Sequence, residues 1–270
     1  MNLTSPSQVK AWCIANDFHP NRTLGQNFLI DRNALLAIVD AGLGAGPAPG
    51  ARVLEVGPGL GVLTEEMLSR GASVTAVEKD PVLAARLPGA LGNPPGLVVV
   101  EGDALEVAAG LGGLAADAGG FDFMVSNLPY QSGTRILLEL ATRRAVPSMT
   151  VLVQDEVAAR LAAGPGSKTR SLAGVWAQLD YDVKVVRRVA PTCFWPRPEV
   201  GSAVVTLSRH DRNVGLSEER RVIFHRLTKR AFEHRRKQLG SIFKDMIQSS
   251  ARAEELSNED WIALVKGLTE

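Results

Sequence analysis

Cysteine is scarce in this 270-residue sequence, which contains only Cys13 and Cys193. The two residues form no CxxC pair and no Cys/His spacing typical of zinc ligands. This scarcity argues against a disulfide framework, a structural zinc site and a thioredoxin-type redox motif. We therefore expect a protein without a bound metal, and a reducing cytoplasm is the simplest compartment for it.

The sequence also lacks an apolar run of the ~20 residues that a helix needs to cross a bilayer. Residues 1–10 are polar and contain no apolar signal core. No internal repeat is evident, and 45% hydrophobic with 22% charged residues is ordinary for a globular protein. We expect no membrane association, and either one large domain or one domain with a small appendage.

The positive and negative residues nearly cancel, so the formal net charge is only +1. The charge is nevertheless unevenly distributed. Residues 220–244 contain nine Lys and Arg residues and a single acid, Glu233, so the rest of the chain is net acidic. A basic segment attached to an acidic body is typical of proteins that bind a polyanion, although part of such a segment can be an ordinary solvated helix face.

Strand-like and helix-like segments alternate in the central part of the sequence. The expected strands are 53–56, 73–78, 97–100, 121–125 and 149–154, and the expected helices are 62–69, 81–87, 134–143 and 154–162. This rhythm predicts an α/β fold with a Rossmann-like, mostly parallel sheet and helices on both faces. Segments 183–189 and 202–208 can add an antiparallel edge.

The remaining segments suggest a second, smaller domain. Before the sheet we expect a weak helix at 9–16, a helix at 32–41 and a Gly-Pro linker at 42–50; residues 108–120 resemble a connecting helix and loop, and helices are expected at 218–232, 236–247 and 259–268. A polar linker at 211–217 precedes the last three helices. We therefore predict a ligand-binding domain at 1–210 and a small helical domain at 211–270.

Residues suited to a nucleoside ligand follow four successive predicted strands. Gly57 and Gly59 end the first strand and let the backbone approach a ligand closely, although their GxGxG spacing differs from the dinucleotide-binding GxGxxG pattern. Glu78 ends the second strand, where a carboxylate can accept hydrogen bonds from ribose hydroxyls. Asp103 follows the third strand, and Asn127 follows the fourth. Each residue alone is weak evidence, but together they favour a binding site at one edge of the sheet.

The segment Asn127-Leu128-Pro129-Tyr130 combines two hydrogen-bond acceptors with an aromatic ring. The Asn127 side chain offers a carbonyl oxygen, the backbone before Pro129 is biased toward an extended shape, and Tyr130 offers a flat face. Such a group suits an exocyclic amine on an aromatic base. Taken alone, the same four residues are more typical of a turn that ends a strand.

Seven segments in order resemble motifs of the ribosomal RNA adenine N6,N6-dimethyltransferases, which use S-adenosylmethionine. Within that family the sequence is most similar to the small-subunit type, the KsgA family. The segments are Gln26-Asn27-Phe28-Leu29, Glu55-Val56-Gly57-Pro58-Gly59, Gly102-Asp103-Ala104, Asn127-Leu128-Pro129-Tyr130, residues 154–160, residues 194–200 and Arg235-Arg236-Lys237-Gln238-Leu239. The resemblance extends from residue 22 to residue 239.

This resemblance implies a set of site residues. The implied S-adenosylmethionine contacts are Asn27, Leu29, Gly57, Glu78, Asp103 and Asn127; the implied catalytic residues are Asn127, Leu128, Tyr130 and Phe194. Glu78 would hold the ribose, Asp103 the cofactor adenine, and Phe194 would provide a second stacking face for the target base. Without the resemblance, Asn27 would be interpreted as a helix-capping amide and Phe194 as a core aromatic.

The resemblance also implies the substrate and the partner. The implied reaction is dimethylation of N6 in two adjacent adenines of the 3'-terminal hairpin of small-subunit (16S) rRNA, within an immature ribosomal particle, by a monomeric enzyme with a role in subunit biogenesis. Cations on the C-terminal helices would contact RNA phosphates. They are Arg226, Lys229, Arg230, Arg235, Arg236 and Lys237, with Arg220 and Arg221 as further candidates.

Other functions remain open at this point. They are a large-subunit rRNA adenine methyltransferase of the antibiotic-resistance type, a DNA adenine methyltransferase, a mainly non-catalytic ribosome-assembly factor and a dinucleotide-dependent oxidoreductase. The sequence also departs from the family pattern in three places. These are Gln131-Ser132-Gly133-Thr134, Asp155 where a basic residue is usual, and Arg22-Thr23 in place of a more basic pair.

Overall fold

The computed structural model describes residues 1–21, 25–109 and 120–268. The chain forms two compact units, the first comprising Met1–Ala158 and Lys184–Ser208 and the second Ala159–Val183 and Arg209–Glu270. The predicted boundary at 210 differs from this division, because 159–183 belongs with the C-terminal helices. The Arg22-Thr23 departure, and residues 110–119 of the expected connecting segment, lie outside the described residues.

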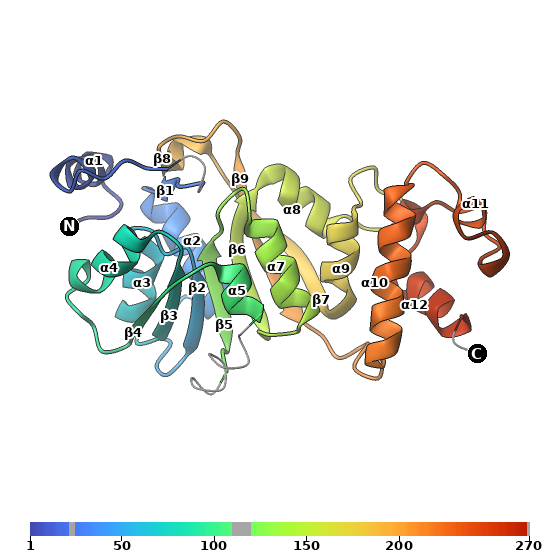
Figure 1. Cartoon of the computed structure of the whole chain (residues 1–270). Helices are drawn as coiled ribbons and strands as arrows, with labels where there is room; N and C mark the ends of the chain where they lie inside the picture. The colour runs from blue at the N-terminus through green and yellow to red at the C-terminus, as the bar shows by residue number, and fades with distance from the viewer. Residues whose placement is uncertain (22–24, 110–119, 269–270) are drawn as a thin grey trace. The chain divides into compact units, whose positions relative to one another are not determined.

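A seven-stranded sheet organises the first unit (Figure 1). Its strands are β2 (Arg52–Val56), β3 (Ser73–Glu78), β4 (Leu97–Glu101), β5 (Phe123–Asn127), β6 (Ser148–Gln154), β7 (Tyr181–Val189) and β9 (Ser202–Arg209). They lie in the order β4-β3-β2-β5-β6-β9-β7. The pairs among β2 to β6 are parallel, and β9 is antiparallel to β6. The predicted Rossmann-like α/β fold is confirmed.

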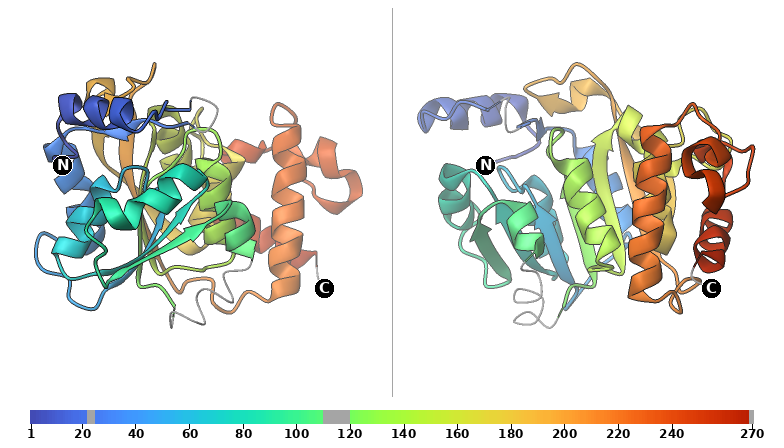
Figure 2. Two further views of the ribbon diagram at one scale, coloured as in Figure 1. Left: turned by 60° about the vertical axis from the view of Figure 1, so that its left-hand side comes forward. Right: turned by 45° about the vertical axis from the view of Figure 1, so that its right-hand side comes forward.

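Helices cover both faces of the sheet (Figures 1 and 2). They are α2 (Arg32–Leu43), α3 (Val62–Ser69), α4 (Pro81–Ala90), α5 (Ala104–Ala109), α7 (Gly133–Thr142) and α8 (Asp155–Ala162). The connections through α3 and α4 move from β2 toward β4, whereas the connection through α7 moves from β5 toward β6. Right-handed crossovers therefore place these helices on opposite faces, and the strand order reverses between β2 and β5. A ligand site is expected at that reversal.

Local sequence explains where several of these helices begin. The Asp31 carboxylate accepts a hydrogen bond from the Ala34 backbone N–H at the start of α2. Asp80 does the same for two N–H groups of α4, which has Pro81 in its first turn. Side-chain acceptors at these positions satisfy N–H groups that the helix itself cannot pair. These hydrogen bonds hold the loop before α2 and the loop between β3 and α4 against the helices that follow them.

The N-terminal part of the first unit adds a short helix and a second, two-stranded sheet. Helix α1 (Pro6–Ala15) lies beside β8 (Phe194–Trp195), although the two are far apart in the sequence (Figure 1). The Lys10 ammonium lies 6.0 Å from the centre of the Trp195 ring. β8 pairs antiparallel with β1 (Phe28–Leu29), so that Leu29 lies opposite Phe194. A short 3₁₀ turn, η2 (Pro191–Cys193), leads into β8.

The second unit is helical. Its elements are α9 (Leu172–Asp180), α10 (Glu218–Glu233), α11 (Leu239–Phe243), η3 (Lys244–Met246), η4 (Ala253–Glu255) and α12 (Asn258–Gly267). Val175, Phe224, Leu227 and Trp261 are central members of its apolar core. The predicted helix at 236–247 is wrong in extent, because Gln238 forms a β-bridge with Arg252 and leaves only a short helix after it. No helix in the described ranges is long and apolar enough to span a bilayer.

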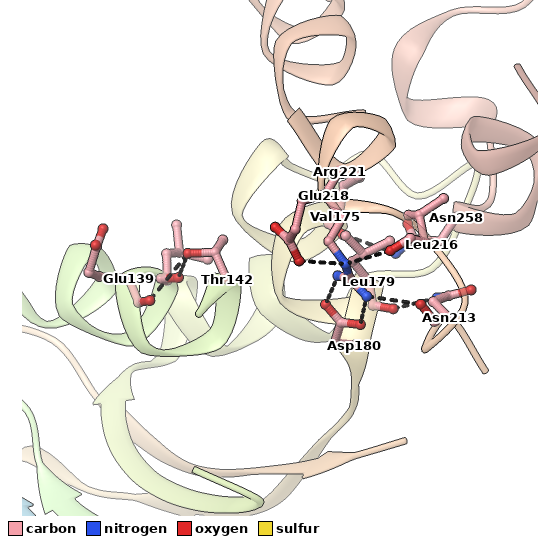
Figure 3. Close-up of polar contacts among 11 residues, drawn as sticks. Glu139, Thr142, Val175, Leu179, Asp180, Asn213, Leu216, Glu218, Arg221 and Asn258 are labelled. Atoms are coloured by element: carbon pink, nitrogen blue, oxygen red, sulfur yellow. Dashed lines mark hydrogen bonds and ion pairs between the residues drawn. The ribbon is translucent and has the colours of Figure 1, made fainter. Parts of the chain in front are cut away.

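A buried ion pair links α9 to α10 within this unit (Figure 3). The Arg221 guanidinium donates to both carboxylate oxygens of Asp180, at 2.6 and 3.0 Å. The Arg221 side chain is 7% exposed and that of Asp180 is 3% exposed. The expectation that Arg221 contacts phosphate is therefore corrected: its guanidinium is buried and already holds Asp180 and the Asn213 carbonyl.

Candidate active site

A cavity of about 210 Å³ opens at the strand-order reversal in the first unit. Most of its wall comes from five stretches of sequence. They are residues 25–29, the turn after β2, the end of β3, the turn after β4 and residues 127–132 after β5. Of the sequence-predicted cofactor and catalytic residues, all but Phe194 line it: Asn27, Leu29, Gly57, Glu78, Asp103, Asn127, Leu128 and Tyr130.

The Asn127 side chain is oriented by a single hydrogen bond. Its Nδ2 donates to the backbone carbonyl of Asn27 at 3.2 Å. In the described part of the chain, its Oδ1 has no donor and remains an acceptor on the cavity wall. The Leu128 backbone N–H donates to the Leu152 carbonyl at 3.1 Å. Among the described residues the Leu128 carbonyl likewise has no donor, so two acceptors lie in adjacent residues.

Tyr130 is held at its hydroxyl end. Its Oη lies 2.7 Å from the Oγ of Ser202, the first residue of β9. The ring is partly buried, and burial raises the pKa of the Tyr130 hydroxyl. A tyrosine held at its hydroxyl keeps the long axis of its ring in one place, which suits a stacking surface.

Two carboxyl groups lie deep in the cavity wall. The Glu78 carboxylate accepts hydrogen bonds from the backbone N–H groups of Gly59 at 3.1 Å and Asp80 at 2.9 Å. Burial raises the pKa of Glu78. Glu55 is 1% exposed, and desolvation raises its pKa to about 8, although the Thr64 hydroxyl donates to it at 2.6 Å and opposes the shift. A positively charged ligand would favour the ionised form of both carboxyls.

Asp103 is prepared as an acceptor by two neighbours. Its Oδ1 accepts from the Leu105 backbone N–H at 2.9 Å, and its Oδ2 lies 2.7 Å from the Lys79 ammonium. The Lys79 hydrogen bond is the main reason why the pKa of Asp103 is lowered. Asp103 is therefore an ionised carboxylate at neutral pH, and each oxygen retains a lone pair for a ligand N–H.

The N-terminal wall and the glycine turn approach residues 127–130 closely. Gly25 has φ +69°, and a Cβ at this position would lie 3.0 Å from the Tyr130 backbone nitrogen. Gly57 has φ +68°, in the left-handed region that favours glycine, and packs against Pro129. Leu29 is buried and pairs with β8. Through these contacts, segments distant in the sequence form a single wall.

Phe194 departs from the expected arrangement. Its side chain is 2% exposed and belongs to the main core cluster with Leu29, Leu152 and Val204. It is not among the residues that line the cavity. The β1–β8 pairing turns its ring into the core, so in this conformation Phe194 cannot stack on a base, and the expectation of a second stacking face is corrected.

We therefore predict that Phe194→Ala acts mainly on stability. Removing a buried phenylalanine leaves a cavity and typically costs about 3–5 kcal/mol. Chemical unfolding monitored by far-ultraviolet circular dichroism measures this loss. The control Val200→Ala, at an exposed position in the loop after β8, should change stability by less than about 0.5 kcal/mol. A fully stable Phe194→Ala variant with lost activity would instead restore the stacking role.

Five of the six cations predicted to bind RNA are exposed, and Arg235 is partly buried. Arg226, Lys229 and Arg230 are exposed on one face of α10, with Phe224 and Leu227 on the buried side. Arg236 and Lys237 are exposed after the helix. The Arg235 guanidinium lies 3.4 Å from Glu254 and donates to the Lys168 carbonyl at 2.6 Å, so it already has partners.

Sequence reasoning missed three residues with contacts at the site. Lys79 holds Asp103, Ser202 holds Tyr130, and Glu55 places a second carboxyl in the wall. Glu55 could have been identified from the sequence, because it is the acid within the otherwise apolar segment Val53–Val56. Ser202 carried no such signal, because its contact depends on how β9 pairs with β6.

The fold is the Rossmann-like fold of several methyltransferases of known structure. Solved structures with a similar fold include a dimethyladenosine transferase from Plasmodium falciparum, with TM-score 0.72, 21% identity and coverage of 87% of this chain and 95% of that one. The 23S rRNA methyltransferase ErmE has TM-score 0.65 and 23% identity, covering 90% of this chain and 100% of that one. Because these identities are low, the two likenesses show the fold alone.

Sequence comparison places the chain within this class. A model of the ribosomal RNA adenine dimethylase family matches residues 17–266. The Ribosomal RNA small subunit methyltransferase A of Deinococcus radiodurans is 46% identical over 209 residues, covering 76% of this chain and 67% of that protein. The protein of the same name from Mycobacterium bovis is 36% identical over 289 residues, covering 98% and 88%. The chain belongs to the ribosomal RNA adenine dimethylase family.

Proposed function

We propose that the protein transfers methyl groups from S-adenosylmethionine to N6 of two adjacent adenines in the 3'-terminal hairpin of small-subunit rRNA. The observation that carries the proposal is the pair of unoccupied acceptors, Asn127 Oδ1 and the Leu128 carbonyl, beside the fixed ring of Tyr130. The small-subunit assignment is supported by relatives such as the Deinococcus radiodurans protein. A monomer acting on an immature particle in the cytoplasm completes the proposal.

The cavity wall fits S-adenosylmethionine. Glu78 uses one lone pair of each oxygen on backbone N–H groups, which leaves acceptors for two ribose hydroxyls. Asp103 can accept from the adenine amino group. Glu55 and Glu78 are carboxyls that a cofactor with a positive sulfonium and ammonium would favour in their ionised form. Asn27 and Leu29 would close the methionine side of the site.

When bound, S-adenosylmethionine supplies an electrophilic methyl group on a positively charged sulfur. The adenine N6 lone pair is delocalised into the ring, so N6 is a weak nucleophile. Asn127 Oδ1 and the Leu128 carbonyl can accept hydrogen bonds from the two N6–H groups, which favours a pyramidal nitrogen and stabilises the positive charge that develops on it. The N6 proton then leaves to solvent, since a protonated aromatic amine is strongly acidic.

Tyr130 would fix the angle of the target base. A base inside a paired or stacked RNA cannot reach the cavity, so the adenine must be unstacked first. Stacking on an aromatic ring then compensates part of the unstacking cost, about 1–3 kcal/mol per base. The Ser202 contact holds the Tyr130 side chain in place. Because Phe194 is buried, Tyr130 is the principal stacking surface.

The direct test is methyl transfer from labelled cofactor to purified immature small subunits and, in parallel, to large subunits. We expect label in small-subunit rRNA, recovered as N6,N6-dimethyladenosine after digestion. Label confined to the large subunit would instead support the large-subunit class of methyltransferase. Binding of immature subunits with no transfer would support a mainly non-catalytic assembly factor.

A further inference from the structure

Four exposed cations lie between residues 184 and 197 of the first unit, distant in sequence from the basic C-terminal helices. They are Lys184, Arg187 and Arg188 on β7 and Arg197 in the loop before β9, and we call them the edge patch. All four side chains are exposed. Within the described residues none of them has an ion pair, and between residues 184 and 201 a single acid, Glu199, accompanies them.

Protection of a sheet edge does not account for this composition. β7 is the last strand of the sheet, and charged side chains on an edge strand do prevent pairing with another chain. The opposite edge, β4, is nevertheless Leu-Val-Val-Val-Glu, with no cation and an exposed Val98. A charge of either sign would protect an edge, whereas residues 184–188 carry positive charge only.

The edge patch begins at the end of the sheet that carries the cavity. Tyr130 Oη lies 2.7 Å from Ser202 Oγ, and Ser202 pairs with Gln154 at the carboxyl end of β6. The preceding residue, Gly201, lies next to the Val189 carbonyl. Arg188 comes immediately before Val189 in β7. Contacts and peptide bonds inside the first unit therefore connect the Tyr130 ring to Arg188.

We infer that the edge patch is a second RNA-binding surface, which holds phosphates of the strand flanking the target adenine. The inference rests on the proposed function, since it requires an RNA base at Tyr130. RNA is favoured over an acidic protein because the RNA whose base stacks on Tyr130 is itself a polyanion. The strand on either side of that base must pass over a surface next to the cavity. Arg187 and Arg188 are adjacent residues of β7, so their side chains point to opposite faces of the sheet. They would therefore contact different phosphates of the RNA.

The test compares two double variants with the same change in charge. Arg187→Gln/Arg188→Gln removes two cations of the edge patch. Arg52→Gln/Arg143→Gln removes two cations near the opposite end of the sheet, where Arg52 pairs with Asp122 and Arg143 with Glu139. The affinity for purified immature small subunits is measured by filter binding across a series of salt concentrations. Thermal unfolding and S-adenosylmethionine affinity are measured in parallel.

We expect the edge-patch variant to bind about 10-fold more weakly, with a salt dependence reduced by about 1.5 in log–log slope, and the control to bind as the unsubstituted protein does. Cofactor affinity should be unchanged in both. Equal binding by the two variants would overturn the RNA surface while leaving the proposed function intact. If the unsubstituted protein fails to bind or methylate small subunits, the proposed function fails, and the edge patch with it.

Discussion

Asn127→Ala is expected to lower methyl transfer at least ~100-fold while cofactor affinity changes only a few-fold. The substitution removes Oδ1, one of the two acceptors that face the N6–H bonds, and an interaction used mainly in the transition state affects turnover more than binding. The loss of the Nδ2 bond to the Asn27 carbonyl accounts for the small effect on the cofactor. Single-turnover transfer to immature small subunits and equilibrium binding of S-adenosylmethionine measure the two effects separately.

The control for this variant is Asn33→Ala, an identical substitution at an exposed position in α2. It should leave both quantities within twofold of the unsubstituted protein. Normal cofactor binding by Asn127→Ala also shows that the first unit has folded. Transfer within threefold of normal by Asn127→Ala would exclude the catalytic role and leave the strand-ending turn as the better interpretation of residues 127–130.

The parts of the fold that the sequence predicted are those with a regular local pattern. α3 and β3 have the predicted bounds: Gly61 and Gly71 flank α3, and β3 lies between Gly71 and the Asp-Pro pair at 80–81. The two-residue strands β1 and β8 are too short to show a period, so their pairing was not foreseen. Helix α9 was also missed: it contains Gly174 and β-branched Val175, and burial in the second unit stabilises it.

The site shows the same division. Glu78, Asp103 and Asn127 could be brought together from the sequence, because parallel strands end at one edge of a sheet. The Tyr130–Ser202 contact depends on the antiparallel register of β9, which no local pattern specifies. Phe194 was placed at the site by resemblance and lies in the core, because its strand pairing determines where the ring points.

A second large effect is expected from Arg221→Met, this time on stability. The substitution leaves the Asp180 carboxylate buried without its partner, and breaking a buried pair from one side costs about 3–5 kcal/mol. The matched control is Arg212→Met. Arg212 also forms an ion pair, with Asp182 at 2.7 Å, but the two side chains are 56% and 50% exposed. Loss of this exposed pair should cost less than about 1 kcal/mol.

The measurement must report on the second unit alone, since unfolding of two units need not be a single transition. Trp176 and Trp261 lie in the second unit, whereas Trp12 and Trp195 lie in the first. In a background with Trp12→Phe and Trp195→Phe, tryptophan fluorescence during urea unfolding follows the second unit. A loss for Arg221→Met no larger than that for Arg212→Met would contradict the prediction.

The same background separates the two possible sources of the loss. If the cost comes from the unpaired Asp180 charge, adding Asp180→Leu to Arg221→Met removes that charge and recovers much of the lost stability. If it comes from the lost Arg221 contacts to the Leu216 and Asn213 carbonyls, the second substitution recovers little. We expect recovery, because a buried carboxylate without a partner is the costlier group and the carbonyls can bind water in place of the guanidinium.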